Sequence, residues 1–374
     1  MATKLSIDPK VLNYYVENAQ VPLYALQEKI KDIDKFLTGE KQPTFNQLSD
    51  IEKKLNIPTG LLLLPKPIDI DNKRLEFRTL GSLKIEKISD ELRDTITDME
   101  KKQNFLREEV EGELNFIGSI SLNENVEKVV EIIRRALNIP IIWQESSNQD
   151  AFKYFRSKIN ELGVYVFLDG IVRQNTRRSL NTKEFRGFAL IDKKAPIIFI
   201  NSTDVGAGRL FTLLHELVHL FLGSEGISNQ VYLDDYLINP DEVFANKVTA
   251  EILVPEKRFL AEIESGFDLA NLAKQFQVSK YVIIRRILDL KKITKDEYRK
   301  YISELNNEFE KNKKSKDEKK ESGGNYYNAV KFKLDRSFFY IIKNAIYSDK
   351  ITYTQAFDIV GVSYKVYKKL EAEF

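Results

Sequence analysis

The sequence predicts an α+β protein that is mostly helical and has a small β-sheet near its middle. Apolar residues recur at helical spacing over most of the chain. Three short segments rich in β-branched and aromatic residues are instead typical of strands, and they lie at 164–170, 186–191 and 196–202. The sheet therefore belongs to a central part that is flanked by an N-terminal helical domain and a C-terminal helical tail.

The elements follow in order along the chain. Short helices are expected before Pro65 and Pro67, which mark a boundary. A long polar helix is expected from Ser89, and the central part combines the three strands with further helices. The lysine-rich run that ends in Gly323 and Gly324 has the composition of a flexible linker. The predicted parts are a helical domain at 1–67, a linker and long helix at 68–119, a mixed domain with a C-terminal helical cap at 120–305, a charged flexible linker at 306–325 and a helical domain at 326–374.

The overall composition limits the classes of function. The formal net charge of +2 is too small to indicate a nucleic-acid or membrane partner for the whole chain. The absence of cysteine excludes disulfides and restricts any metal site to histidine and carboxylate ligands. The first residues lack the layout of a signal peptide, and the longest apolar runs are far too short to span a membrane. We therefore expect a cytoplasmic protein with no membrane contact.

The only two histidines, His215 and His219, lie four residues apart in the apolar stretch LLHELVHLFLG. On a helix this spacing places both imidazoles on one face, where they can bind a single metal ion. This pattern, with a glutamate after the first histidine, arises by chance in about 5 of 10,000 arrangements of this composition. The alternative is a pair of structural histidines, which requires two polar rings in an otherwise apolar helix at a considerable cost in free energy. A metal site is the better interpretation.

A catalytic zinc site needs a third protein ligand, which must be an aspartate or a glutamate here. Glu242 opens a predicted helix that can pack against the histidine helix, and Asp241 is better explained as the N-cap of that helix. Spacing alone favours Glu242 only slightly. The candidates are Asp234, Asp235, Asp241, Glu242 and Glu251.

The same residues suggest a hydrolytic chemistry. Zn²⁺, with Mn²⁺ as an alternative, lowers the pKa of a bound water. Glu216 is displaced around the helix from His215, so it can act on that water as general base and then as general acid to the leaving amine. The candidates for stabilising the transition state or orienting ligands are Arg209, Tyr232, Tyr236 and Asn246, although Arg209 can equally brace the fold. Asn201 is expected to orient a ligand or hold a turn.

Three stretches in this order resemble the ImmA/IrrE metallopeptidases that carry an N-terminal XRE-type helix-turn-helix domain. RGFALIDKKAPIIFINS is similar to the family's strand pair, and RLFTLLHELVHLFLG to its zinc-binding helix, with Leu214 for alanine and Val218 for glycine. EVFANKVTAEILVP is similar to the block whose first glutamate is the third zinc ligand, with Val248 and Thr249 for Phe-Ala. This resemblance implies a gluzincin-like metallopeptidase core and assigns the third ligand to Glu242.

The resemblance also implies a function and partners. Members of this family are site-specific endopeptidases that often cleave a DNA-binding repressor in phage, mobile-element or stress circuits, and some are thought to act beside a toxin as antitoxins. The expected partner is thus a repressor or toxin protein. A non-proteolytic regulatory or antitoxin-like binding protein and a helix-turn-helix transcriptional regulator are the alternatives.

The N-terminal segment departs from an ordinary XRE motif. GEKQPTFNQLSDIEKKLNIPTGLLLLPKP resembles that half of the family, but the chain between Leu23 and Gly39 is too short for a full recognition helix. The helix expected there carries Asp32 and Asp34 and lacks the arginine, asparagine or glutamine that read bases. We therefore expect a degenerate helix-turn-helix that acts as a docking module, with DNA binding as the less favoured reading.

Overall fold

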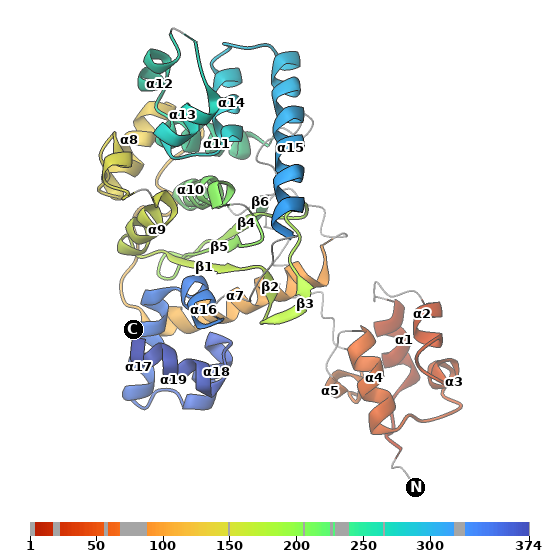
Figure 1. Ribbon diagram of the computed structural model, residues 1–374. Coiled ribbons are helices and arrows are strands. Elements are labelled where there is room, and N and C mark those ends of the chain that lie inside the picture. Colours follow the sequence, from red (N-terminus) through yellow and green to blue (C-terminus); the bar gives the residue numbers. More distant parts are fainter. Residues whose placement is uncertain are drawn as a thin grey trace. The chain divides into compact units, whose positions relative to one another are not determined.

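The computed structural model describes residues 4–17, 23–55, 59–67, 88–148, 150–204, 206–224, 227–228, 239–264, 266–317 and 326–373 (Figure 1). The chain forms two compact units, Met1–Arg78 and Thr79–Phe374. Among the described residues, no helix has both the length and the apolar character needed to cross a membrane.

The N-terminal unit is a bundle of short helices, as its sequence predicts. The helices are α1 (Pro9–Glu17), α2 (Leu23–Gln27), α3 (Ile33–Thr38), α4 (Phe45–Leu55) and α5 (Thr59–Leu62). Val11, Phe36 and Leu48 are among the side chains that fill their common core. Helix α3 has only six residues, and Gly39 ends it in a left-handed conformation that glycine adopts without strain.

The larger unit is built on a four-stranded sheet with the order β1–β5–β4–β6. The strands are β1 (Tyr165–Asp169), β4 (Gly187–Leu190), β5 (Ile197–Asn201) and β6 (Ile227–Ser228). Strands β1 and β5 are parallel, whereas β4 pairs with both β5 and β6 in antiparallel orientation. The three strands predicted from the sequence are confirmed. Strand β6 and the hairpin of β2 (Ile171–Val172) and β3 (Asn175–Ser179) were not predicted, because they are very short or, in β3, lack apolar alternation.

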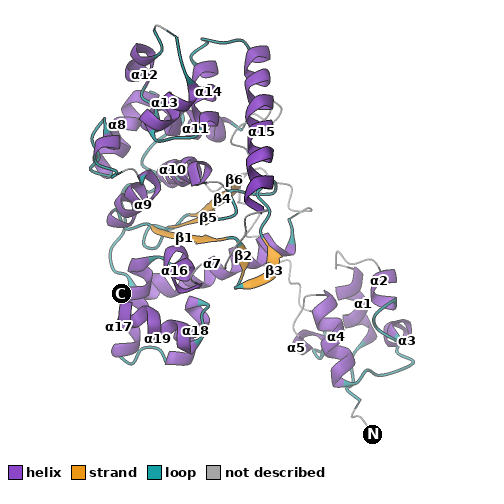
Figure 2. Cartoon of the chain, viewed as in Figure 1, coloured by secondary structure: helices purple, strands orange, loops and turns teal. Residues whose placement is uncertain are grey.

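Helices cover both faces of this sheet (Figure 2). Helices α9 (Ala151–Glu161) and α10 (Gly206–Leu222) lie on one face, and α7 (Asp90–Glu109) and α16 (Tyr326–Lys333) lie on the other. Strand β5 alternates accordingly, since Ile198 and Ile200 join the core beside α10, whereas Phe199 stacks on Phe188 of β4. These apolar residues of β5 therefore alternate between two layers, one on each face of the sheet.

Gly187 allows α10 to pack closely on the sheet. A Cβ atom at this position would lie 2.6 Å from Cγ2 of Thr212 on α10 and 2.8 Å from the carbonyl oxygen of Phe199. A larger residue would force the helix away from β4, because real Cβ atoms do not approach other atoms so closely. The glycine thus fixes the depth at which the histidine helix lies.

Further helices complete the layer around α10. They are α8 (Val126–Ala136), α11 (Pro240–Leu253), α12 (Glu256–Glu262), α13 (Leu269–Phe276), α14 (Lys280–Asp289) and α15 (Lys295–Asp317). Helix α15 differs from the prediction of a flexible linker over 306–325, because it continues to Asp317. Lysine and glutamate are good helix formers, and neither glycine nor proline interrupts the run before Gly323. The remainder of the predicted linker, 318–325, lies outside the described residues.

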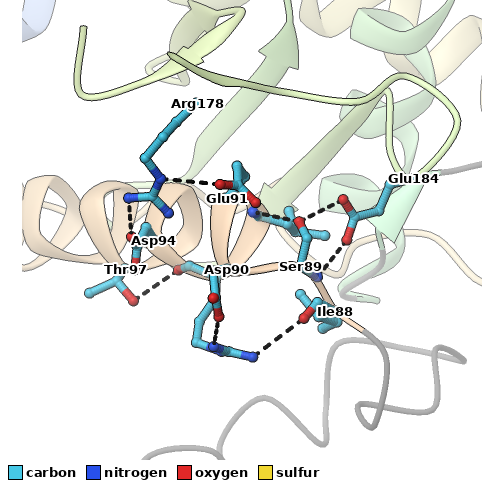
Figure 3. Close-up of polar contacts among 10 residues, drawn as sticks. Ile88, Ser89, Asp90, Glu91, Asp94, Thr97, Arg178 and Glu184 are labelled. Atoms are coloured by element: carbon cyan, nitrogen blue, oxygen red, sulfur yellow. Dashed lines mark hydrogen bonds and ion pairs between the residues drawn. The ribbon is translucent and has the colours of Figure 1, made fainter. Parts of the chain in front are cut away.

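Helix α7 is anchored by polar contacts at its N-terminal end to β3 and to the segment between β3 and β4 (Figure 3). The Ser89 hydroxyl caps the helix by accepting from the Leu92 N–H, and Ser89 donates through its backbone N–H and its hydroxyl to Glu184, both at 2.7 Å. Arg178 of β3 donates to Glu91 at 3.1 Å and to Asp94 at 2.7 Å. The long polar helix is therefore part of the larger unit.

The C-terminal helices are also packed against this unit. They are α16, α17 (Arg336–Tyr347), α18 (Tyr353–Val360) and α19 (Tyr364–Glu373). Asp335, which is fully buried, caps α17 through the Phe338 N–H and also accepts hydrogen bonds from the Val166 N–H at 2.8 Å and from the Asn160 side chain. Arg156 donates to the carbonyl oxygens of Val166 and Leu334. The tail is thus joined to β1 and α9, and the finer division of the chain into five parts stays a prediction.

Asp335→Ala should destabilise the larger unit by about 3 kcal/mol, because it removes an N-cap and leaves buried N–H groups without an acceptor. Urea unfolding followed by circular dichroism measures this change. Asp358→Ala, at an exposed position on α18, is the matched control and should be nearly neutral. Equal stabilities for the two variants would contradict this role of Asp335.

Candidate metal centre

Helix α10 brings three polar side chains into an apolar interior. Most of its apolar residues, among them Leu213, Leu217 and Leu220, are fully buried, so the middle of the helix is surrounded by apolar side chains. His215, Glu216 and His219 are at most 2% exposed. Polar groups buried to this extent require partners, so the neighbouring elements must supply them.

Glu242 of α11 provides the partner for both histidines. Its Oε2 lies 3.0 Å from Nε2 of His215, and its Oε1 lies 3.3 Å from Nε2 of His219. The two Nε2 atoms are 3.0 Å apart. Ligand atoms at the corners of a zinc tetrahedron are about 3.3 Å apart when each bond is about 2.0–2.1 Å long. The donor atoms and their spacing therefore fit one metal ion.

The N-terminal end of α11 determines which carboxylate reaches the histidines. Asn239 caps the helix by accepting from the Asp241 N–H, and Pro240 occupies the first helical position. The prediction that Asp241 is the cap is therefore wrong: proline is favoured at the first helical position, so the residue before it takes the cap. Glu251 forms an ion pair with Arg286 instead. Asp234 and Asp235 lie outside the described residues.

Among the described residues, His215, His219 and Glu242 form the only group of three or more histidine, aspartate or glutamate side chains that could hold an ion.

The three side chains of this group shift one another's pKa values. Burial would raise the pKa of Glu242, but hydrogen bonds and charge from both imidazoles hold that pKa far below its usual range. Burial lowers the pKa of His215. Burial also opposes protonation of His219, yet its hydrogen bond to Glu242 and the charge of Glu216 raise its pKa.

Two other residues are placed to orient the imidazoles. The Ser224 hydroxyl lies 3.2 Å from Nδ1 of His219. Asn246 lies one turn after Glu242 on α11, and its side chain acts on the pKa of His215. Asn246 is among the residues expected from the sequence. Ser224 is not, because a serine two residues after the end of α10 gives no other signal. Outer contacts of this kind fix the orientation of a histidine ligand.

The other candidates have different positions. The Arg209 guanidinium lies over the rings of Phe152 and Phe332, at 5.8 and 5.7 Å, so its described contacts brace α10 against α9 and α16. Asn201 holds the turn after β5, where it donates to the Phe185 carbonyl oxygen and accepts from Thr203. Tyr232 and Tyr236 lie outside the described residues.

Residues 159–288 match the family model of the IrrE N-terminal-like domain, peptidase family M78. This segment extends from α9 to α14 and includes the sheet, α10 and α11. The match supports the resemblance to the ImmA/IrrE family and indicates a hydrolase of the metallopeptidase type. Comparisons with curated proteins and with solved structures gave no match.

Glu242→Ala should weaken zinc binding by about 100-fold or more, because it removes the carboxylate that contacts both imidazoles. Competition with a chromophoric chelator measures the affinity. Asp241→Ala, one residue earlier on the same helix, is the matched control and should bind zinc like the unaltered protein. Equal losses in the two variants would show that Glu242 is not a ligand.

Zinc affinity should rise about tenfold per pH unit below the pKa of His219 and level off above it, because the ion displaces one proton from this imidazole. The pKa of His219 is raised above its ordinary 6.5, so the rise should extend above pH 6.5. Zinc titrations across this range test the expectation. An affinity that is independent of pH would contradict it.

Proposed function

We propose that this protein is a zinc-dependent endopeptidase that cleaves a regulatory protein at a specific site. The observation that carries the proposal is the convergence of His215, His219 and Glu242 on one point, with the carboxylate of Glu216 buried on the same helix. The match to a peptidase family over the segment that contains all four residues supports it.

The three converging side chains would hold the ion. Zn²⁺ bound there supplies a Lewis acid that makes water nucleophilic at neutral pH. Two imidazoles and one carboxylate suit zinc, and manganese is the alternative because it also accepts nitrogen and oxygen ligands. Three protein ligands are the number that is typical of catalytic zinc sites, whereas structural sites usually have four.

Glu216 would move the proton. It follows His215 directly, so its side chain is displaced around α10 from the face that carries both imidazoles. Its charge raises the pKa of His219, which supports a position of the carboxylate near the ligands. Glu216 would accept a proton from the attacking water and pass it to the nitrogen of the leaving amine, so that the peptide bond breaks with no net change in proton number.

The N-terminal unit would dock the protein substrate, which we propose to be a repressor or a toxin. Residues 1–67 contain no arginine and have nearly balanced lysine and acidic residues, so the segment lacks the excess of positive charge that favours binding to phosphate groups. Helix α3 has six residues, of which Ile33 and Phe36 are buried. A short helix of this kind offers few exposed side chains to a DNA groove, which favours docking of a protein.

Glu216→Gln should retain zinc and lose cleavage, because glutamine keeps the shape of the side chain but cannot accept the proton. The zinc-loaded protein is incubated with the products of neighbouring genes, and fragments are identified by mass spectrometry. Glu262→Gln, at an exposed position of α12, is the control and should cleave normally.

Three outcomes would contradict the proposal. Unchanged cleavage by Glu216→Gln would exclude this role of Glu216. A stable complex with no fragments from the zinc-loaded protein would favour the non-proteolytic binding protein. Sequence-dependent retention of duplex DNA at moderate salt would favour the transcriptional regulator.

A further inference from the structure

A cavity of about 230 Å³ lies on the face of the sheet opposite α10. Helix α7, the β2–β3 hairpin, helix α16 and the turn between α18 and α19 surround it, and these elements meet below the sheet in Figure 1. We call it the α7–α16 cavity. Its apolar walls include Met99, Phe167, Phe199, Val330, Leu334 and Val362. It is separate from the candidate metal centre, whose residues do not line it.

Charged side chains line the same cavity, and positive charge is in excess. Lys102 of α7 donates to Asp98, and Nε of Arg173 lies 3.4 Å from the other oxygen of Asp98. Two cations thus share one carboxylate. Lys333 of α16 has its own partner in Asp169, at 2.7 Å. The charged lining residues are therefore three cations and two carboxylates.

Lys102 is an unusual residue for a structural position. It is only 4% exposed, and burial lowers its pKa. Its ammonium group has three N–H donors, and among the described residues Asp98 is the acceptor that it contacts. Lysine is seldom buried to this extent unless its charge is well paired. The N–H groups of this ammonium are therefore placed to donate to an anion that enters the cavity.

We propose that the α7–α16 cavity binds a small organic carboxylate with a compact apolar body. The carboxylate would contact Lys102 and Arg173, and the body would lie against the apolar walls. The volume corresponds to about eight water molecules of liquid, which limits the ligand to about eight to twelve non-hydrogen atoms. The proposal is independent of the proposed peptidase activity, because it rests on other residues.

A bound ligand would also contact the junction between the sheet and the C-terminal helices. Gln174, in the turn between β2 and β3, donates to the Gly361 carbonyl oxygen and accepts from the Tyr326 hydroxyl. All three residues line the cavity. Binding should therefore stabilise the attachment of α16, α18 and α19 and raise the melting temperature of the larger unit.

The test compares three probes of similar shape: phenylacetate, the neutral phenylacetamide and the cationic phenethylamine. Each is titrated at millimolar concentration into the zinc-loaded, full-length protein, with calorimetry and the melting temperature as readouts. Phenylacetate should bind about tenfold or more tightly than the other two, because charge-assisted hydrogen bonds require its negative charge. If no probe binds, or if the amide binds as tightly, the proposal is wrong.

Variants locate the site. Lys102→Met keeps the length of the side chain and should weaken phenylacetate binding about tenfold or more. Arg173→Met should also weaken it, and its side chain is half exposed, so this variant tests the site even if Lys102→Met unfolds. Lys101→Met, at the exposed neighbouring position on α7, should bind like the unaltered protein.

A carboxylate can also bind zinc, so the titration is repeated on the metal-free protein. The affinity for phenylacetate should be the same, because the cavity and the metal centre lie on opposite faces of the sheet. Binding that disappears with the metal, or that neither Lys102→Met nor Arg173→Met changes, would overturn the proposal.

Discussion

Helix α10 places two imidazoles and a carboxylate in an interior that is otherwise apolar, and the surrounding structure must compensate for their burial. His215, Glu216 and His219 are almost fully buried. Leaving such groups without partners would cost several kcal/mol each. The Glu242 carboxylate contacts both Nε2 atoms, and the Ser224 hydroxyl contacts Nδ1 of His219. The packing of α11 against α10 therefore supplies the polar partners that the buried imidazoles need. The same contacts bring together the ligand atoms of the candidate metal centre.

The sheet gives this arrangement a fixed base and divides the larger unit into two layers. Gly187 allows α10 to lie close to β4, so the histidine helix is held between the sheet and α11. On the other face, Asp335 attaches the C-terminal helices to β1, and Arg178 and Ser89 attach α7 to β3 and to the segment after it. Apolar packing and a few polar contacts thus hold the helices on each side. The layer with α10 carries the candidate metal centre, and the opposite layer contains the charged α7–α16 cavity.

Much of this architecture could be predicted from the sequence. The three central strands and the short N-terminal helices were identified from periodicity and composition. The end of α15 at Asp317 could not be predicted. The lysine and glutamate residues of this segment are typical of a solvated linker, but they also favour a helix when no glycine or proline interrupts it. The cap of α11 was misassigned because Asp241 is a good capping residue in isolation. Asn239 precedes the proline and takes that place. Contacts between distant segments, such as Asp335 with the Val166 N–H, leave little local signal.

The sequence by itself determined the chemistry of the candidate site. Two histidines one helical turn apart, a glutamate between them and the lack of cysteine restrict the ligands to imidazole and carboxylate, because side-chain type and helical spacing are local properties. Spacing left five carboxylates open and the resemblance pointed to Glu242, but only the tertiary structure brings a carboxylate to the histidines, because the packing of α11 on α10 places Glu242 beside both imidazoles. The tertiary structure alone also brought Lys102, Arg173 and Lys333 around one cavity, since long-range packing joins residues that no local pattern connects.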